Sequence, residues 1–126
     1  MRQARVNRET QEQIALMMWC GFQKSVYPEL DLIFHIVNEG KRSARTGAEL
    51  KRMGMKKGVP DICLPVPRGM YHGLWIELKA DKTKRATKEQ KEWLVKLTKQ
   101  GYKAVMCYGA DDAITVIKEY LNLKSE

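Results

Sequence analysis

The sequence has only three cysteines, and none of them lies close to another. Cys20, Cys63 and Cys107 are odd in number, widely separated and embedded in apolar segments. A disulfide framework typically has an even number of cysteines, and a zinc knuckle has paired cysteines at short spacing. We therefore expect three reduced cysteines that pack in the core.

Long apolar runs, internal repeats and low-complexity segments are also missing. The apolar stretch at residues 15–22 is far shorter than the roughly 18 residues that a membrane span requires. The first residues lack the apolar segment of a signal peptide. For a chain of 126 residues without a linker, we expect a single domain over residues 1–126. We also expect no membrane partner and a cytoplasmic location, in a bacterial or phage-infected host cell.

Positive charge is present in excess. Lysine and arginine number 23 against 15 aspartates and glutamates, which gives a formal net charge of +8. Such a balance favours a polyanionic partner, and nucleic acid is the leading candidate. Charge alone leaves open the alternative of a merely basic soluble protein.

The apolar patterning predicts an α/β fold in which one mixed sheet is flanked by helices, in the order αβαββαβα. Strands are expected at residues 32–37, 61–66, 73–79 and 102–108, with helices at 8–23, 43–53, 87–100 and 111–121. The second and third strands should form a central hairpin.

Three features of the helices follow from spacing. Thr87 and Gln90 have the spacing of a capping box, and Asp111 or Asp112 is expected to cap the last helix. Apolar residues recur along the first helix at helical intervals. The face that we expect this helix to bury consists of Ile14, Met17, Met18, Gly21 and Phe22.

Asp61, Glu77 and Lys79 carry the strongest chemical signal. Side chains two residues apart on a strand share a face, so Glu77 and Lys79 point the same way. The hairpin would place Asp61 beside them. Two carboxylates can hold Mg²⁺ or Mn²⁺, and an adjacent lysine can orient a water and stabilise charge that develops on a phosphate. This pattern predicts hydrolysis of phosphodiester bonds.

Three motifs surround these residues: Gly-Val-Pro-Asp at residues 58–61, Glu-Leu-Lys at 77–79, and Gln90 in a Thr-x-x-Gln helix start. Together they resemble the virus-type replication-repair nuclease (VRR-NUC) family of the PD-(D/E)xK superfamily, in its stand-alone, phage-like form. The resemblance covers nearly the whole chain. It implies the restriction-endonuclease-like PD-(D/E)xK fold and metal-dependent cleavage of DNA.

For the site itself, the resemblance implies a role for each motif residue. Asp61 and Glu77 would ligate the metal with help from the Leu78 carbonyl. Lys79 would position or activate the attacking water, and Gln90 would support the site.

The family also has a glutamate near the metal in its first helix. Glu9 and Glu12 are both candidates here, and we favour Glu12 because it lies two residues before the apolar Ile14. Either glutamate would equally suit the favourable end of the helix dipole.

Basic residues lie close to these motifs along the chain. A solvated loop is the ordinary interpretation of such residues, but their proximity to the site favours phosphate binding. Residues 38–42 resemble a basic segment of phage relatives that commonly begins with proline, where this chain has Val37. The residues that we expect to contact nucleic acid are Lys41, Arg42, Lys56, Lys57, Lys82, Lys84 and Arg85.

Each signal also has a structural alternative. Glu77 and Lys79 could form an exposed strand face on which the charges satisfy each other, and Gln90 could serve only in the capping box. His35 and His72 have no partner at metal-ligand spacing, so we assign them no chemistry.

The resemblance implies a substrate and an assembly as well. Similar lone domains resemble Holliday-junction resolvases, which implies branched DNA as the partner and a homodimer as the active form. One alternative is a flap or single-strand nuclease. Another is a basic DNA-binding module that has lost catalysis.

Overall fold

A four-stranded sheet with strand order β1-β2-β3-β4 forms the centre of the computed structural model, which describes residues 7–37 and 44–124. The first three strands pair antiparallel, and β4 runs parallel to β3. The predicted element order and mixed sheet are confirmed, with a 3-10 helix, η1, in addition. In chain order the elements are α1 (Arg8–Phe22), η1 (Pro28–Leu32), β1 (Phe34–His35), α2 (Ala44–Arg52), β2 (Ile62–Leu64), β3 (Leu74–Lys79), α3 (Lys88–Lys99), β4 (Lys103–Tyr108) and α4 (Gly109–Leu121).

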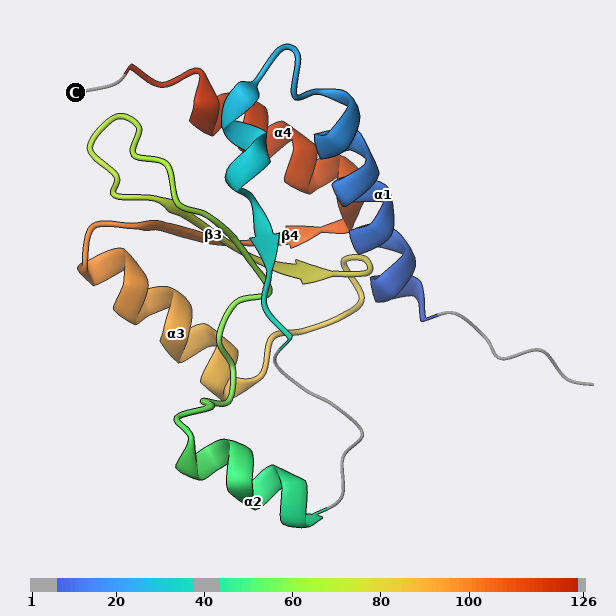
Figure 1. The fold of residues 1–126 in the computed structure, drawn as a ribbon, viewed down its shortest axis with the longest axis vertical. Helices are drawn as coiled ribbons and strands as arrows, with labels where there is room; N and C mark the ends of the chain where they lie inside the picture. Colours follow the sequence, from blue (N-terminus) through green and yellow to red (C-terminus); the bar gives the residue numbers. More distant parts are fainter. Residues whose placement is uncertain (1–6, 38–43, 125–126) are drawn as a thin grey trace, which may run out of the picture.

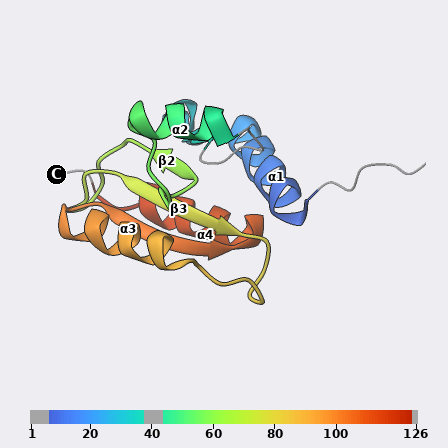
Figure 2. The same ribbon diagram turned by 90° about the horizontal axis from the view of Figure 1, so that it is seen from below.

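The two faces of the sheet have different coverings. Leu74, Ile76 and Leu78 of β3 are buried in the core that α1 and α4 complete. Strand side chains alternate, so Glu77 and Lys79 lie on the opposite face, where α3 packs. Figure 1 shows α1 and α4 side by side on one side of the sheet and α3 on the other, while both views place α2 outside this layered body (Figure 2).

Helix α1 buries a different face from the one that its periodicity predicted. Leu16 and Cys20 are almost completely buried, whereas Ile14, Met18 and Phe22 are 52%, 57% and 77% exposed. The prediction was wrong because residues 14–20 are all apolar, so spacing alone selects no unique stripe. Contact with α4 and the sheet decides which residues turn inward.

The start of α4 also differs from the prediction. The helix begins at Gly109, before Asp111 and Asp112, so neither aspartate occupies the N-cap position. Asp112 instead accepts a hydrogen bond from the Tyr108 backbone N–H at 2.8 Å, and Glu12 accepts one from the Ala110 N–H at 2.7 Å. Part of the capping therefore comes from α1, at the other end of the chain, which local spacing cannot reveal.

Strand β1 is shorter than expected. Pro28 starts η1, a position that suits its fixed φ angle, and this helix includes Leu32. Only Phe34 and His35 remain in the strand, although the Ile36 N–H still donates to the Asp61 carbonyl at 2.7 Å. This edge of the sheet therefore reaches directly to Asp61.

The three cysteines are buried with free thiols, as predicted. Burial raises the pKa of Cys20 and Cys63 to about 11 and that of Cys107 to about 12. These thiols therefore stay protonated and pack as small apolar groups. In the part of the chain that the structure describes, no helix is long and apolar enough to cross a membrane.

Candidate active site

The β2–β3 hairpin brings Asp61 to the side of β3. Ile62 pairs with Ile76, so Asp61, one residue before β2, lies next to Glu77. The Asp61 Oδ2 atom accepts a hydrogen bond from the Leu78 backbone N–H at 2.9 Å. This bond fixes the carboxylate against the strand that carries Glu77 and Lys79.

The loop before Asp61 depends on Gly58. This residue has a φ angle of +89°, and a Cβ atom there would come within 2.7 Å of the Glu89 backbone. Glycine is therefore required for the loop to approach the start of α3 so closely. The approach explains the Gly-Val-Pro-Asp motif, since it brings the Asp61 loop next to the turn that contains Gln90.

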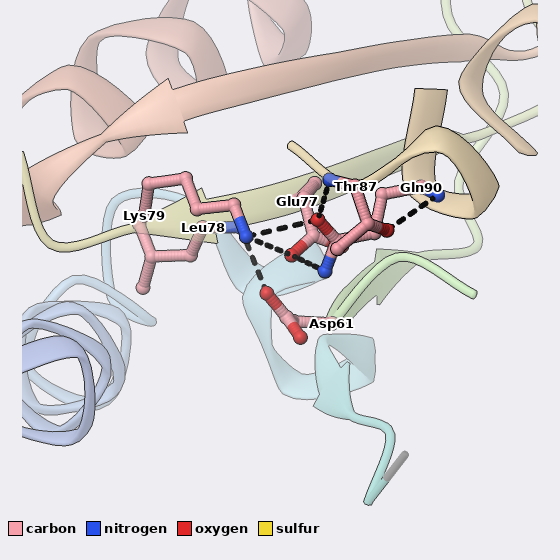
Figure 3. A network of polar contacts seen from close by, with 6 residues as sticks. All are labelled: Asp61, Glu77, Leu78, Lys79, Thr87 and Gln90. Carbon is pink, nitrogen blue, oxygen red and sulfur yellow. Dashed lines mark hydrogen bonds and ion pairs between the residues drawn. The ribbon is translucent and has the colours of Figure 1, made fainter. Parts of the chain in front are cut away.

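Gln90 joins the start of α3 to the charged residues of β3 (Figure 3). Its Nε2 donates to Glu77 Oε2 at 3.1 Å, and its Oε1 accepts from Lys79 Nζ at 2.9 Å. The same Oε1 accepts from the Thr87 backbone N–H at 2.9 Å, while the Gln90 N–H donates to Thr87 Oγ1. Gln90 therefore completes the predicted capping box and contacts both candidate catalytic side chains.

Glu77 lies in an electrostatically unfavourable position. Its side chain is 1% exposed, and its Oε1 atom has no hydrogen-bond partner among the described residues. Burial, followed by the nearby Asp61 carboxylate, raises the pKa of Glu77 to about 8, even though Lys79 opposes the shift. Lys79 Nζ is 3.6 Å from Glu77 Oε2, so its positive charge offsets only part of the negative charge of the two carboxylates. A bound cation or a proton would relieve the remaining negative charge.

These residues fit a divalent cation, although they form an open set of ligands. The unpartnered carboxylate oxygen of Glu77 and the adjacent Asp61 are the hard oxygen donors that Mg²⁺ and Mn²⁺ prefer. Within residues 7–37 and 44–124, no three His, Cys, Asp or Glu side chains gather closely enough to form a metal cage by themselves. Mg²⁺ commonly binds through one or two carboxylates together with waters and substrate phosphates, which suits this arrangement.

A cleft of about 540 Å³ opens beside these residues. Its walls come from the first half of α1, the end of β1, the loop before β2 and the start of α3. Glu9, Asp61 and Gln90 all line this cleft. Of the two first-helix glutamates, Glu9 faces the cleft and contributes to the raised pKa of Glu77. Glu12, the residue that the sequence favours for this role, accepts a hydrogen bond from the Ala110 N–H at the start of α4.

Comparisons with known proteins agree with this geometry. A family model of the VRR-NUC domain matches residues 7–111. A solved structure titled "VRR_NUC domain protein" is 38% identical in sequence and superposes with a TM-score of 0.83, covering 97% of this chain and 94% of that chain. The chain belongs to the VRR-NUC family. No match is found among curated proteins.

Membership in this family identifies the chain as a nuclease domain with the PD-(D/E)xK fold. It also implies that the substrate is DNA. The resemblance inferred from the motifs is thereby confirmed. Members of the family generally depend on a divalent metal, which agrees with the chemistry of the Asp61 and Glu77 pair.

Five of the basic residues expected to contact nucleic acid lie on two loops of the described chain, before β2 and after β3. Lys57 lines the cleft, and the Lys57 carbonyl accepts a hydrogen bond from Trp93 Nε1 at 3.0 Å. Lys56 is exposed on the same loop. The loop after β3 exposes Lys82, Lys84 and Arg85. The remaining two candidates, Lys41 and Arg42, lie outside the described residues.

Nothing in the sequence indicates that His35 lies in the cleft. His35 lines the cleft, and its Nδ1 atom lies 3.0 Å from the Asp61 carbonyl oxygen. The pairing of β1 with β2 places it there, and no motif spacing indicates this pairing. His72 packs edge-on against the Tyr102 ring at the other end of β3, where a structural role accounts for it.

Glu77 should make the stability of the VRR-NUC domain depend on pH in the absence of metal. The unfolded chain releases this proton near pH 4.5, whereas the folded chain holds it up to about pH 8. Unfolding therefore releases a proton within this window, and stability should fall as the pH rises through it. We expect urea midpoints measured in EDTA to decrease accordingly, and the Glu77→Gln variant to lack this decrease. An equal slope in both proteins would contradict the assignment.

Proposed function

We propose that the protein is a metal-dependent DNA endonuclease that hydrolyses phosphodiester bonds with an activated water. The observation that carries this proposal is that Asp61, just before β2, lies beside Glu77 and Lys79 of β3, where a buried Glu77 oxygen has no hydrogen-bond partner among the described residues. Such an arrangement is costly for folding unless it serves a cation and a substrate. Membership in a nuclease family supports the same conclusion.

Asp61 and Glu77, together with the Leu78 carbonyl, would hold Mg²⁺ or Mn²⁺. The hydrogen bond from the Leu78 N–H to Asp61 Oδ2 keeps the ligand-bearing segments in register. When bound, the cation supplies positive charge that stabilises the phosphate as negative charge develops on it. Gln90 fixes the orientation of the Glu77 carboxylate by donating to its Oε2 atom.

Lys79 would orient the attacking water. An ammonium has three N–H donors, and in this structure one of them is directed to Gln90 Oε1 at 2.9 Å. Gln90 thereby fixes the position of the ammonium, which can use another donor to hold water and to stabilise developing charge. No side-chain arrangement in the sequence suggests a covalent nucleophile, so direct hydrolysis is the mechanism that we propose.

We also propose Glu9, in place of Glu12, as the acid that the first helix contributes. Glu9 lines the cleft beside Asp61, and its charge acts on Glu77. Glu12 already accepts the Ala110 N–H at the start of α4. Glu9 would thus act in the site, whereas Glu12 would have a structural role.

For the substrate, we propose branched DNA, cut by a homodimer in which each chain acts as one nuclease unit. Exposed Met18 and Phe22 on α1, together with Leu32 on the adjacent η1, support an apolar contact between two copies. Leu30, also on η1, is 1% exposed and belongs to the core, so it cannot contribute to such a contact. A two-fold dimer would present its two sites to two of the four strands of a junction.

The ligands and the lysine should be essential for cleavage. Asp61→Ala and Lys79→Ala should each abolish metal-dependent cleavage, because one removes a ligand and the other removes the group that orients water. DNA binding should persist and should weaken steeply with salt, since basic side chains supply most of the affinity. Gel assays of cleavage and anisotropy measurements of binding test this. The exposed Lys118→Ala serves as the control, and normal cleavage by Asp61→Ala would refute the site.

The two glutamates of α1 form a matched pair for a second test. Glu9→Gln should reduce cleavage at least about tenfold with little effect on folding, because it removes charge beside the cation. Glu12→Gln should retain cleavage but lose about 1 kcal/mol of stability through weaker capping of α4. Cleavage rates and urea unfolding separate these effects. The reverse pattern would restore Glu12 as the first-helix acid.

The substrate preference is tested by comparing cleavage of DNA substrates of different structure. We expect faster cleavage of four-way junctions than of matched duplex, and a dimeric mass by light scattering, because paired sites match the symmetry of the junction. Flap and single-stranded DNA are included with Mg²⁺ or Mn²⁺ and with neither. A monomer that cuts only flaps or single strands would replace this proposal with that alternative. Binding without cleavage under every condition would favour the non-catalytic module.

A further inference from the structure

His35 occupies a position in the cleft that the proposed hydrolysis does not use. It is exposed on β1, the edge strand of the sheet, and lines the cleft next to Asp61. Its Nδ1 atom lies 3.0 Å from the Asp61 carbonyl oxygen. A carbonyl can only accept a hydrogen bond, so Nδ1 carries the proton and the ring is held in one orientation.

This hydrogen bond is not needed to hold the Asp61 backbone. The same carbonyl accepts the Ile36 N–H at 2.7 Å, which is the shorter of the two bonds. The contact therefore constrains the imidazole more than it constrains Asp61. A flat ring that is exposed and orientationally fixed is suited to contact a flat ligand.

The surroundings of the ring define the chemistry of that ligand. Ile14 and Val37 line the same cleft and are 52% and 70% exposed, so they offer apolar surface. Thr10 and Gln13 add polar groups that can pair with hydrogen-bonding edges. The Glu9 and Asp61 carboxylates and the Lys57 side chain also line the cleft, so the lining carries no excess of positive charge that would attract a further phosphate. A neutral, flat group with polar edges fits this lining, and a nucleobase has these properties.

The size of the cleft restricts how a base can enter. A volume of about 540 Å³ falls in the range of pockets that hold one small molecule. A base that remains stacked in a duplex cannot enter a pocket of this kind, whereas an unpaired or extruded base can.

We propose that His35, together with Ile14 and Val37, forms a subsite that binds one unstacked nucleobase beside the scissile phosphate. The inference rests on the proposed nuclease function and extends it to the choice of substrate. An already unpaired nucleotide enters without the cost of unstacking, whereas a paired base at a junction must first leave the stack, and the subsite would offset that cost next to the cut.

Three variants of His35 distinguish stacking from support of Asp61. His35→Ala removes both the ring and the Nδ1 donor. His35→Phe keeps a flat ring without the donor, and His35→Asn keeps a donor near the Nδ1 position without the ring. His72→Ala, which alters a histidine at the other end of β3, is the control.

The binding experiment uses branched DNA that carries 2-aminopurine at successive positions around the branch point, with EDTA present so that no strand is cut. The wild-type protein should change the fluorescence strongly at one position, where the base leaves the stack. His35→Ala and His35→Asn should lose this signal, and His35→Phe should restore most of it. In cleavage assays with metal, His35→Ala and His35→Asn should each raise KM about tenfold with kcat nearly unchanged.

An abasic nucleotide at the responsive position provides the matching substrate change. The KM of the wild-type protein should then rise by the same factor, and His35→Ala should not raise KM any further on this DNA. If His35→Asn behaves as wild type while His35→Phe is impaired, the residue supports Asp61 and the subsite is rejected. Equal behaviour of all three variants and wild type also rejects it. A wild-type protein that never cuts DNA rejects the proposed function instead, and the fluorescence signal in EDTA still tests the subsite.

Discussion

The burial of Glu77 beside Asp61 is the constraint on which the rest of the site depends. Two carboxylates lie together in a place where one side chain is 1% exposed, and a single lysine offsets part of their charge. Low local polarity makes such a pair unfavourable unless a proton or a cation is present. This unfavourable electrostatic free energy is confined to one end of the β2–β3 hairpin. The raised pKa of Glu77 and the affinity proposed for a divalent cation are two consequences of the same arrangement.

The elements around this pair hold it in place from three directions. The β2–β3 register sets Asp61 next to Glu77, and the Leu78 N–H fixes the Asp61 carboxylate. Helix α3 contributes Gln90, whose position depends on its capping box and on the close approach that Gly58 permits. The third direction is α1, which closes the cleft. Since α1 and α3 cover opposite faces of the sheet, the cleft lies where these two layers meet its edge.

Local patterns in the sequence were sufficient to predict the central part of the site. Strand alternation placed Glu77 and Lys79 on one face, and capping-box spacing identified Gln90 at a helix start. The remaining features depend on contacts between distant segments. Packing of α1 against α4 decides that Glu12 turns toward Ala110, and it leaves Glu9 at the cleft. In the same way, His35 reaches Asp61 only because β1 pairs with β2, which no local spacing indicates.

The most direct test of the central claim is a calorimetric titration of Mn²⁺ into the protein at a pH slightly below 8, repeated in buffers with different ionisation enthalpies. If the cation replaces the Glu77 proton, the wild-type protein should bind it saturably and release protons to the buffer. Asp61→Ala should show no comparable binding. Saturable binding without proton release, or equal binding by the wild-type protein and Asp61→Ala, would contradict the account.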